Sequence, residues 1–302
     1  MAFEKGMALL LAQERATCNS AAQMTGALDW AAASGDSWAA RWRALDLALG
    51  NLSQHLIRTI FDRASVGDIR ALDIGCGAGA TTLAVADTPR FNIIGCDLSP
   101  ALIAIATERA EGRPNVRFCL GDACSVASSE APFDLLFSRH GVMFFADPVA
   151  AFSNLLAAAR PGASLVFSCF ADWSRNAWAS RVAEAAAGHG LEPPDKSPSG
   201  FAFADPAYVG AILTDAGWAG LEHQFVEFRY SAGSGEGAVD DALELLAHVG
   251  PASAQLRDLD EGARPAAKMR MRRIIEAHRN DRVVDFPAAA WIWSARAAGE
   301  SR

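Results

Sequence analysis

The stretch ALDIGCGAGATT, residues 71–82, limits the fold more than any other part of the chain. It begins with residues typical of a buried β-strand, continues with three alternating glycines (Gly75, Gly77 and Gly79) and then starts a helix. Such turns bind nucleotides, because glycine lets the backbone approach a ligand and the helix N-terminus offers free N–H groups. The spacing also fits the dinucleotide-binding pattern, with Ala80 in the last glycine position.

Five short apolar runs follow one another from this point, and segments with a helical pattern separate them. The runs cover residues 71–74, 91–97, 116–122, 133–138 and 164–170. Strands that alternate with helices at this spacing predict βαβ units and a parallel sheet, and therefore an α/β fold. Two further strands are expected at residues 221–230 and 288–297.

Helical segments flank and interrupt this pattern, and they predict four parts of the chain. These are an N-terminal helical cap (1–65), a core (66–230) with an insertion or loop (171–204), a helical lid or substrate subdomain (231–287), and a last strand with its tail (288–302). The helical stretch at 238–278 is too long for an ordinary connection, so we expect it to cover the ligand face. SAGSGEG, at 231–237, is expected to be a loop, as is the Pro/Ser-rich stretch at 191–200.

Composition excludes several classes of protein. The 302 residues carry a net charge of −8, which argues against nucleic-acid binding, and the basic run at 268–279 is expected to be a solvated helix face. No apolar run approaches the roughly 18 residues that span a bilayer. The six cysteines form no C-x-x-C pair, so we expect neither disulfides nor a zinc site, and a cytoplasmic location. The oligomeric state stays open.

Three aspartates fall at or near the carboxyl ends of successive predicted strands. Asp73, Asp97 and Asp122 are 24 and 25 residues apart, which is about one βα unit each time. Open α/β sheets bind ligands beyond these strand ends, so the three carboxylates are expected to point into one crevice. Like charges repel at close range, which makes a pyrophosphate a poor ligand beside Asp73. A cationic ligand with an adenosine group, such as S-adenosylmethionine, suits these acids better.

The sequence resembles the class I S-adenosylmethionine-dependent methyltransferases over about a third of its length. The matching stretches are ALDIGCGAG (71–79), IIGCDLSPALIAIA (93–106), VRFCLGDA (116–123), FDLLFSRHGVMFFADP (133–148) and AARPGASLVFSCF (158–170). Each stretch is a weak signal, but their common order and spacing are specific. The resemblance implies a Rossmann-like, doubly wound, seven-stranded sheet, mostly parallel with an antiparallel last strand, and helical additions at both ends. It also implies methyl transfer to an oxygen or nitrogen atom.

The resemblance further implies a role for each matching residue. The three glycines would approach the methionine part and adenosine of the cofactor, and Asp73 would orient its ammonium group. Asp97 would accept hydrogen bonds from both ribose hydroxyls. The remaining implied contacts are Leu98, Asp122 and Ala123 with the adenine, Ser138 and Arg139 with the methionine side, and Trp38 and Arg41, from a Trp-bearing segment at 29–46, with the sulfonium and carboxylate.

Other interpretations of these residues stay open. Asp73 could cap the glycine turn, Asp97 could start the next helix, and Asp122 could serve as a turn residue. The tryptophans of segment 29–46 could pack on the core instead of covering the cofactor. The glycine spacing also suits an NAD-dependent oxidoreductase, although Asp73 and Asp122 argue against it. A protein that binds S-adenosylmethionine without transferring its methyl group is a further alternative.

His140 is the candidate catalytic residue outside the cofactor set. It follows the fourth predicted strand, and a neutral histidine can take the proton that an oxygen or nitrogen acceptor loses. If it does, the rate is expected to rise with pH through an ionisation in the histidine range. The alternative is a histidine that only shapes the pocket. No metal is expected, because no His/Asp/Glu group has metal-ligand spacing. The acceptor is expected to be a small, partly apolar metabolite.

Overall fold

The computed structural model describes residues 30–299, and one eight-stranded sheet runs through them. The strands are β1 (Ile69–Ile74), β2 (Phe91–Asp97), β3 (Val116–Leu120), β4 (Phe133–Arg139), β5 (Ala159–Phe170), β6 (Ala219–Ser234), β7 (Arg279–Asn280) and β8 (Val283–Arg296). Their order is β3-β2-β1-β4-β5-β8-β6, with β7 beside β8. Neighbours from β3 to β5 are parallel, whereas β8 runs antiparallel to β5 and β6. The predicted sheet with its antiparallel last strand is confirmed, and the two-residue β7 is an addition to it.

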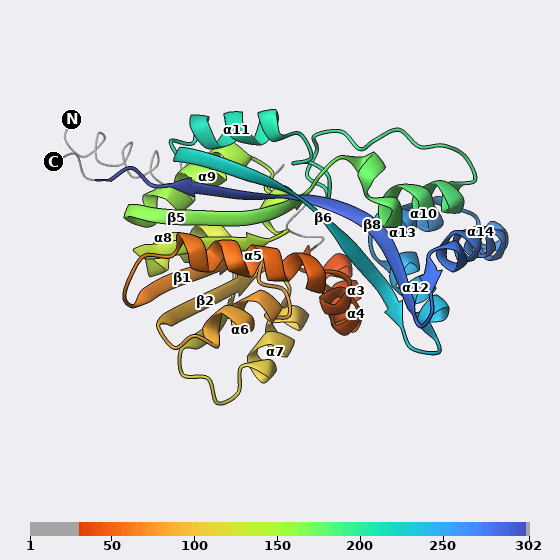
Figure 1. Cartoon of the computed structure of the whole chain (residues 1–302), viewed down its shortest axis with the longest axis horizontal. Helices are drawn as coiled ribbons and strands as arrows, with labels where there is room; N and C mark the ends of the chain where they lie inside the picture. Colours follow the sequence, from red (N-terminus) through yellow and green to blue (C-terminus); the bar gives the residue numbers. More distant parts are fainter. Residues whose placement is uncertain (1–29, 300–302) are drawn as a thin grey trace, which may run out of the picture.

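Helices cover both faces of this sheet, as in a doubly wound fold (Figure 1). The helices are α3 (Ala33–Ala40), α4 (Trp42–Ala48), α5 (Gly50–Arg63), α6 (Ala80–Ala86), α7 (Pro100–Arg109), α8 (Ala123–Glu130), α9 (Pro148–Ala157), α10 (Ala177–Ala187), α11 (Pro206–Asp215), α12 (Ala238–His248), α13 (Pro251–Asp258) and α14 (Arg264–Ala277). Three short 3-10 turns are η1 (Val142–Phe144), η2 (Trp173–Arg175) and η3 (Glu261–Ala263). In Figure 1, α5, α6 and α7 lie in front of the sheet, and α8, α9 and α11 lie behind it.

Local sequence signals start several of these helices where they are expected. The Asp205 carboxylate accepts a hydrogen bond from the backbone N–H of Ala207, and Pro206 occupies the first helical position of α11. The same acid–proline pair, Asp147 followed by Pro148, starts α9. An N-cap acceptor satisfies a backbone donor that has no partner inside the helix, and proline costs nothing where that donor is unused. Both helices therefore start where this local chemistry favours a helix N-terminus.

The last two long strands extend further than expected. β6 continues through Ser234, so the expected loop at 231–237 is wrong for its first four residues. There the Ser231 hydroxyl donates to the Asp285 carboxylate at 2.6 Å, and Gly233 pairs with Val284. Glycine and serine favour turns, but pairing with β8 overrides that local preference.

The extended parts of β6 and β8 carry a second lobe, made of α10, α12, α13 and α14 (Figure 1). α10 comes from the predicted insertion at 171–204, yet it packs on α13 and α14. Arg270 fixes this contact by donating to the carbonyls of Ala185 and Ala186, both at 2.7 Å, near the C-terminal end of α10. A cation is favourable at that end of a helix. The functional division of the chain into four parts stays a prediction, and residues 1–29 of the cap lie outside the described part.

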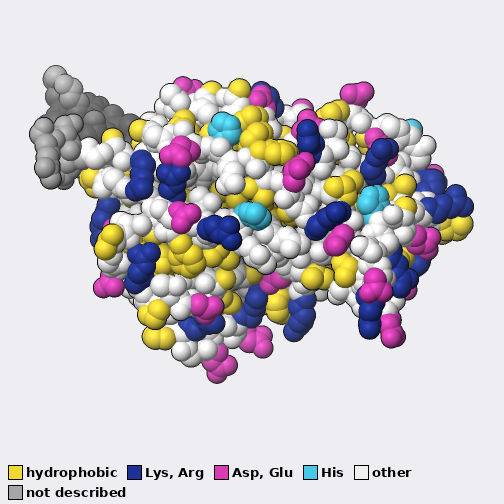
Figure 2. Space-filling model, in the orientation of Figure 1, with side chains coloured by type: hydrophobic (Ala, Val, Ile, Leu, Met, Phe, Trp, Pro, Cys, Tyr) yellow, Lys and Arg dark blue, Asp and Glu magenta, His cyan; other side chains and the backbone are white. Residues whose placement is uncertain are grey.

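One hydrophobic core joins the sheet to this lobe. In the sheet, the rings of Phe167 and Trp293 stack with centroids 6.3 Å apart. The same buried cluster reaches Leu246 and Met271 in the lobe. Within residues 30–299, no helix is long and apolar enough to cross a membrane. Acidic and basic side chains are interspersed over the face drawn in Figure 2.

Candidate functional site

The glycine turn after β1 is held in left-handed backbone conformations. Gly75, Gly77 and Gly79 have φ angles of +64°, +55° and +80°, which glycine adopts without the penalty of a Cβ. A Cβ on Gly79 would lie 2.7 Å from the ring of Phe118, whereas the space beside Gly77 is open. Gly79 therefore serves close packing at the start of α6. Gly75 packs against the backbone of Gly141, whose Cα would lie 3.1 Å from a Cβ, and Gly77 leaves room for a ligand.

Asp97, the last residue of β2, holds this turn in place. Its Oδ2 atom accepts a hydrogen bond from the N–H of Gly77 at 2.8 Å, and its Oδ1 atom accepts one from the N–H of Ser99 at 2.9 Å. Burial raises the pKa of the Asp97 carboxyl, although these backbone hydrogen bonds favour its charged form. The carboxylate thus lies beside the glycine turn. The alternative that Asp97 starts the next helix is wrong, because Ser99 caps α7.

Asp73 lies in β1 beneath the turn and is 1% exposed. Its Oδ2 atom accepts a hydrogen bond from the Thr82 hydroxyl at 2.5 Å, whereas its Oδ1 atom is buried without a partner. Burial raises the pKa of Asp73 to about 7, because the charged form loses its hydration. A buried acceptor without a donor is costly, so Oδ1 is suited to receive a donor from a ligand.

The third aspartate differs from the other two because it is exposed. Asp122 is exposed, and its Oδ1 atom accepts hydrogen bonds from the N–H groups of Cys124 and Ser125, at 3.0 and 3.1 Å, which caps α8. Leu98 and Ala123 are partly buried nearby. None of the three lines the cavity described below, so their contacts with an adenine stay a prediction.

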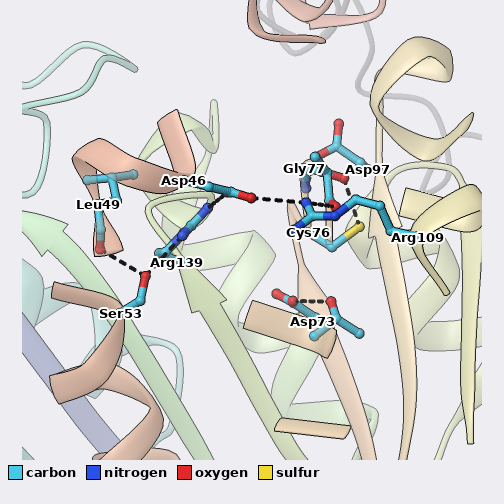
Figure 3. Close-up of polar contacts among 11 residues, drawn as sticks. Asp46, Leu49, Ser53, Asp73, Cys76, Gly77, Asp97, Arg109 and Arg139 are labelled. Atoms are coloured by element: carbon cyan, nitrogen blue, oxygen red, sulfur yellow. Dashed lines mark hydrogen bonds and ion pairs between the residues drawn. The ribbon is translucent and has the colours of Figure 1, made fainter. Parts of the chain in front are cut away.

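The end of β4 supplies a cation and an anchor. Arg139 is held by the Ser53 hydroxyl at 2.9 Å and by the Asp46 carboxylate at 3.2 Å, and its guanidinium lies near Asp73 (Figure 3). Ser138 is fully buried and donates to the carbonyl of Ile74 at 2.7 Å, so it ties β4 to the end of β1. Arg139 thus lines the cavity described below, and Ser138 joins two strand ends. Their contacts with the methionine side stay a prediction.

The N-terminal cap closes over the turn through its tryptophans but not through Arg41. Trp38 and Trp42 line the cavity. The Arg41 guanidinium instead pairs with Glu244 of α12 at 2.7 Å and does not line it. The sequence pattern does not reveal this long-range ion pair. It engages the Arg41 guanidinium, which the resemblance places against the carboxylate of the cofactor.

These elements enclose a cavity of about 40 Å³ over the glycine turn. It is lined by Trp38, Trp42, Leu45, Asp46, Leu49, Asp73, Gly75, Cys76, Gly77, Ala78, Thr81, Leu102 and Arg139. Sequence reasoning missed Asp46, which binds both Arg139 and Arg109, because an acid inside a helix is usually solvated. It also missed Thr81, whose hydroxyl is buried without a partner. The position of Thr81 in the first turn after the glycines is a signal that would have identified it.

His140 follows β4 directly and is 5% exposed. Its φ angle is +63°, a conformation that few residues other than glycine adopt. Its Nδ1 atom lies 2.8 Å from the Ser168 hydroxyl, and its Nε2 atom is buried without a partner. Burial and then the charge of Arg139 lower the pKa of His140 to about 3. The lowered pKa favours the neutral ring and argues against an ionisation of His140 in the histidine range.

Known proteins resemble this chain in sequence and in fold. Residues 71–162 match the family described as "Methyltransferase domain". This match agrees with the resemblance of these residues to the class I S-adenosylmethionine-dependent methyltransferases. The chain is 32% identical over 151 residues to a malonyl-[acyl-carrier protein] O-methyltransferase of Paenibacillus, a match that covers 47% of this chain and 54% of the relative. It is 33% identical over 100 residues to phosphoethanolamine N-methyltransferase 1 of Triticum aestivum, which covers 33% of this chain and 20% of that protein.

Solved structures agree with the fold of the methyltransferase class. The YcgJ protein of Bacillus subtilis aligns with a TM-score of 0.51 at 17% identity, over 82% of this chain and all (100%) of that one. A putative methyltransferase of Bacillus halodurans aligns with a TM-score of 0.50 at 14% identity, over 80% of this chain and 98% of the other. The chain spans only part of the length of the first curated relatives, about a fifth of one and half of another.

The site suits the cofactor of this class, S-adenosyl-L-methionine, whose product is S-adenosyl-L-homocysteine. The unpartnered Oδ1 atom of Asp73 complements an ammonium group, and the Arg139 guanidinium in the same cavity complements a carboxylate. Within residues 30–299, no group of three His, Cys, Asp or Glu side chains is placed to hold a metal ion.

Replacing Asp73 with asparagine should stabilise the protein at high pH and weaken cofactor binding. The folded-state pKa of about 7 lies above the ordinary 3.8, so folding loses stability as pH rises from about 4 to 7. The uncharged amide avoids this cost, and its benefit at pH 8 should exceed that at pH 5 by about 2–3 kcal/mol. Denaturant unfolding at both pH values measures this difference, and calorimetry should show weaker S-adenosylhomocysteine binding. A benefit that does not change with pH would contradict the raised pKa.

Proposed function

We propose that this chain transfers the methyl group of S-adenosylmethionine to an oxygen or nitrogen atom of a small, partly apolar metabolite. The observation that carries the proposal is the pairing of opposite charges in one cavity beside the glycine turn. There the free Oδ1 atom of Asp73 and the guanidinium of Arg139 complement the two ends of an amino acid. A pyrophosphate has no group for Asp73, which argues against NAD.

Further residues of the turn and strand ends extend this interaction to the nucleoside. Asp97 would accept hydrogen bonds from the ribose hydroxyls. A carboxylate offers about four lone-pair sites, and the backbone N–H groups of Gly77 and Ser99 use two of them. Leu98, Asp122 and Ala123 would contact the adenine. Gly75 and Gly77 would lie against the ligand because neither carries a side chain.

The acceptor is proposed to bind between the strand ends and the second lobe. The buried rings of Phe170, Trp178 and Phe201 pack together there, and the edge of Phe170 contacts the imidazole of His140 with centroids 4.0 Å apart. Aromatic walls favour an apolar or aromatic acceptor. The relatives act on chemically different acceptors, as their names state, so they do not select one for this chain.

Residues of this chain would act on the acceptor mainly by positioning its reacting atom in line with the methyl group of the cofactor. The cofactor, when bound, supplies an electrophilic methyl group, and displacement at carbon depends on alignment. The Nε2 atom of His140 would accept a hydrogen bond, or the proton, from the acceptor's O–H or N–H group. Ser168 holds the other ring nitrogen. A ring with so low a pKa is a weak base, which favours the hydrogen bond over full proton transfer.

Isothermal titration calorimetry tests the cofactor assignment. We expect S-adenosylmethionine and S-adenosylhomocysteine to bind with micromolar dissociation constants and NAD to show no binding. The reverse order of affinity would refute the proposal. Turnover with candidate acceptors, measured as S-adenosylhomocysteine formation, separates an enzyme from a protein that binds the cofactor without transferring its methyl group. Cofactor binding without turnover on any acceptor would favour that alternative.

A further inference from the structure

Asp46 of α4 connects the cap to both arginines beside the cavity. Its Oδ1 atom lies 3.2 Å from Nη2 of Arg139, and its Oδ2 atom lies 3.0 Å from Nη1 of Arg109 (Figure 3). The Asp46 side chain is 22% exposed. Arg139 has one other partner, the hydroxyl of Ser53. Asp46 therefore supplies the only negative charge that pairs with Arg139 among the described residues.

Within residues 30–299, Arg139 is also the only cationic side chain that lines the cavity. If the proposed cofactor binds there, its carboxylate needs this guanidinium, because the other charged groups lining the cavity are Asp46 and Asp73. A carboxylate of the protein and a carboxylate of the ligand thus compete for one partner. This step of the argument rests on the proposed function.

The cap also has to move outward before the cofactor can enter. A cavity of about 40 Å³ has room for only a few water molecules, far less than an adenosine group needs. The cap packs closely on the core, since a Cβ on Gly35 would lie 2.6 Å from the Ser99 hydroxyl. It is held on its other side by the ion pair between Arg41 and Glu244 and by a hydrogen bond from the Ser37 hydroxyl to the carbonyl of His248.

We propose that Asp46 is a built-in competitor for the amino-acid end of the cofactor. Its carboxylate pairs with Arg139 in the ligand-free protein, and the ligand's carboxylate displaces it on binding. Arg109 keeps hold of the displaced Asp46, because Arg109 is fixed on the core by the carbonyl of Ala78 at 2.6 Å.

This exchange predicts how much the ligand's carboxylate contributes to affinity. In the native protein, one charge-assisted pair replaces another, so the net gain from the carboxylate is small. In an Asp46→Asn variant, the amide binds Arg139 less strongly, and the incoming carboxylate recovers more of its interaction. The variant should fold, because Arg139 keeps Ser53, and Arg109 keeps Ala78 and Trp42.

The test compares two ligands on two proteins by calorimetry. The ligands are S-adenosylhomocysteine and its decarboxylated analogue, which keeps the ammonium group and the nucleoside. Asp46→Asn should bind S-adenosylhomocysteine about tenfold more tightly than the native protein and bind the analogue within about twofold of it. Equal changes for both ligands, or weaker binding of S-adenosylhomocysteine alone, would overturn the proposal.

Glu244→Gln is the matched control. It breaks the ion pair between the cap and α12 but leaves the partners of Arg139 untouched. Looser closure without charge competition should change the affinity for both ligands by the same factor. A selective gain for S-adenosylhomocysteine in this control would also count against Asp46 as the competitor.

The native protein gives an independent answer should Asp46→Asn fail to fold. Loss of the ligand's carboxylate should weaken native binding by less than about tenfold, since Asp46 returns to Arg139. A loss of about a hundredfold or more would mean that Asp46 does not compete. Binding of neither ligand would refute the proposed function itself, whereas binding of both with no selective effect would refute only the role of Asp46.

Discussion

Replacing Asp97 with alanine is expected to weaken S-adenosylhomocysteine binding by about 2 kcal/mol or more, roughly thirtyfold. A buried carboxylate that accepts hydrogen bonds from ribose hydroxyls makes charge-assisted interactions, which are stronger than neutral ones. The variant also loses the acceptor for the Gly77 N–H, so part of the loss comes from a less ordered glycine turn. Calorimetry measures the affinity, and denaturant unfolding without ligand measures the structural share.

Asp122→Ala is a useful comparison for Asp97→Ala. Asp122 is exposed and caps α8, so its removal should cost about 1 kcal/mol of stability. Asp122→Ala should weaken ligand binding less than Asp97→Ala does, because a hydrogen bond from a ligand to an exposed carboxylate competes with water. If Asp97→Ala lowers stability but leaves the affinity unchanged, Asp97 only holds the turn.

Local patterns were sufficient to predict the core of the fold. Apolar runs that end in acids predicted the parallel strands, because this signal depends on neighbours within a few residues. The extension of β6 beyond Tyr230 could not be predicted this way. Ser231 and Gly233 are turn formers, and only pairing with β8, about fifty residues later in the chain, makes them a strand.

The candidate site was predictable where backbone geometry determines it and not where distant charges do. Asp73 and Asp97 lie at the glycine turn because strands β1 and β2 bring them there. The ion pairs of Arg41 and Asp46 could not be predicted from local patterns. Their partners Glu244 and Arg139 are 203 and 93 residues away in the sequence. Each of these partners comes from an element whose position only the complete fold determines. The pattern that suggested a base at His140 likewise contains nothing about its burial.

Replacing His140 with alanine is expected to lower turnover by about 10² to 10⁴-fold if its Nε2 atom receives the acceptor's proton or its hydrogen bond. Cofactor affinity should change little, because His140 does not line the cavity that contains Asp73 and Arg139. Steady-state rates and calorimetry on the same preparations measure the two effects. His140→Asn is the matched control, since asparagine tolerates a positive φ angle and keeps a polar side chain near Ser168. A loss in both variants assigns the effect to the imidazole and not to backbone strain.

The pH dependence separates the two roles of His140. With a pKa of about 3, the ring is neutral from pH 5 to pH 8, so the native rate should show no ionisation of His140 in that range. A rise in rate with a midpoint near pH 6.5, removed by His140→Ala, would contradict the effect of burial on this ring. If His140→Ala keeps most of the activity, His140 belongs to the wall of the pocket. The acceptor then loses its proton to water or binds already ionised, and any remaining pH dependence reports the acceptor's own pKa.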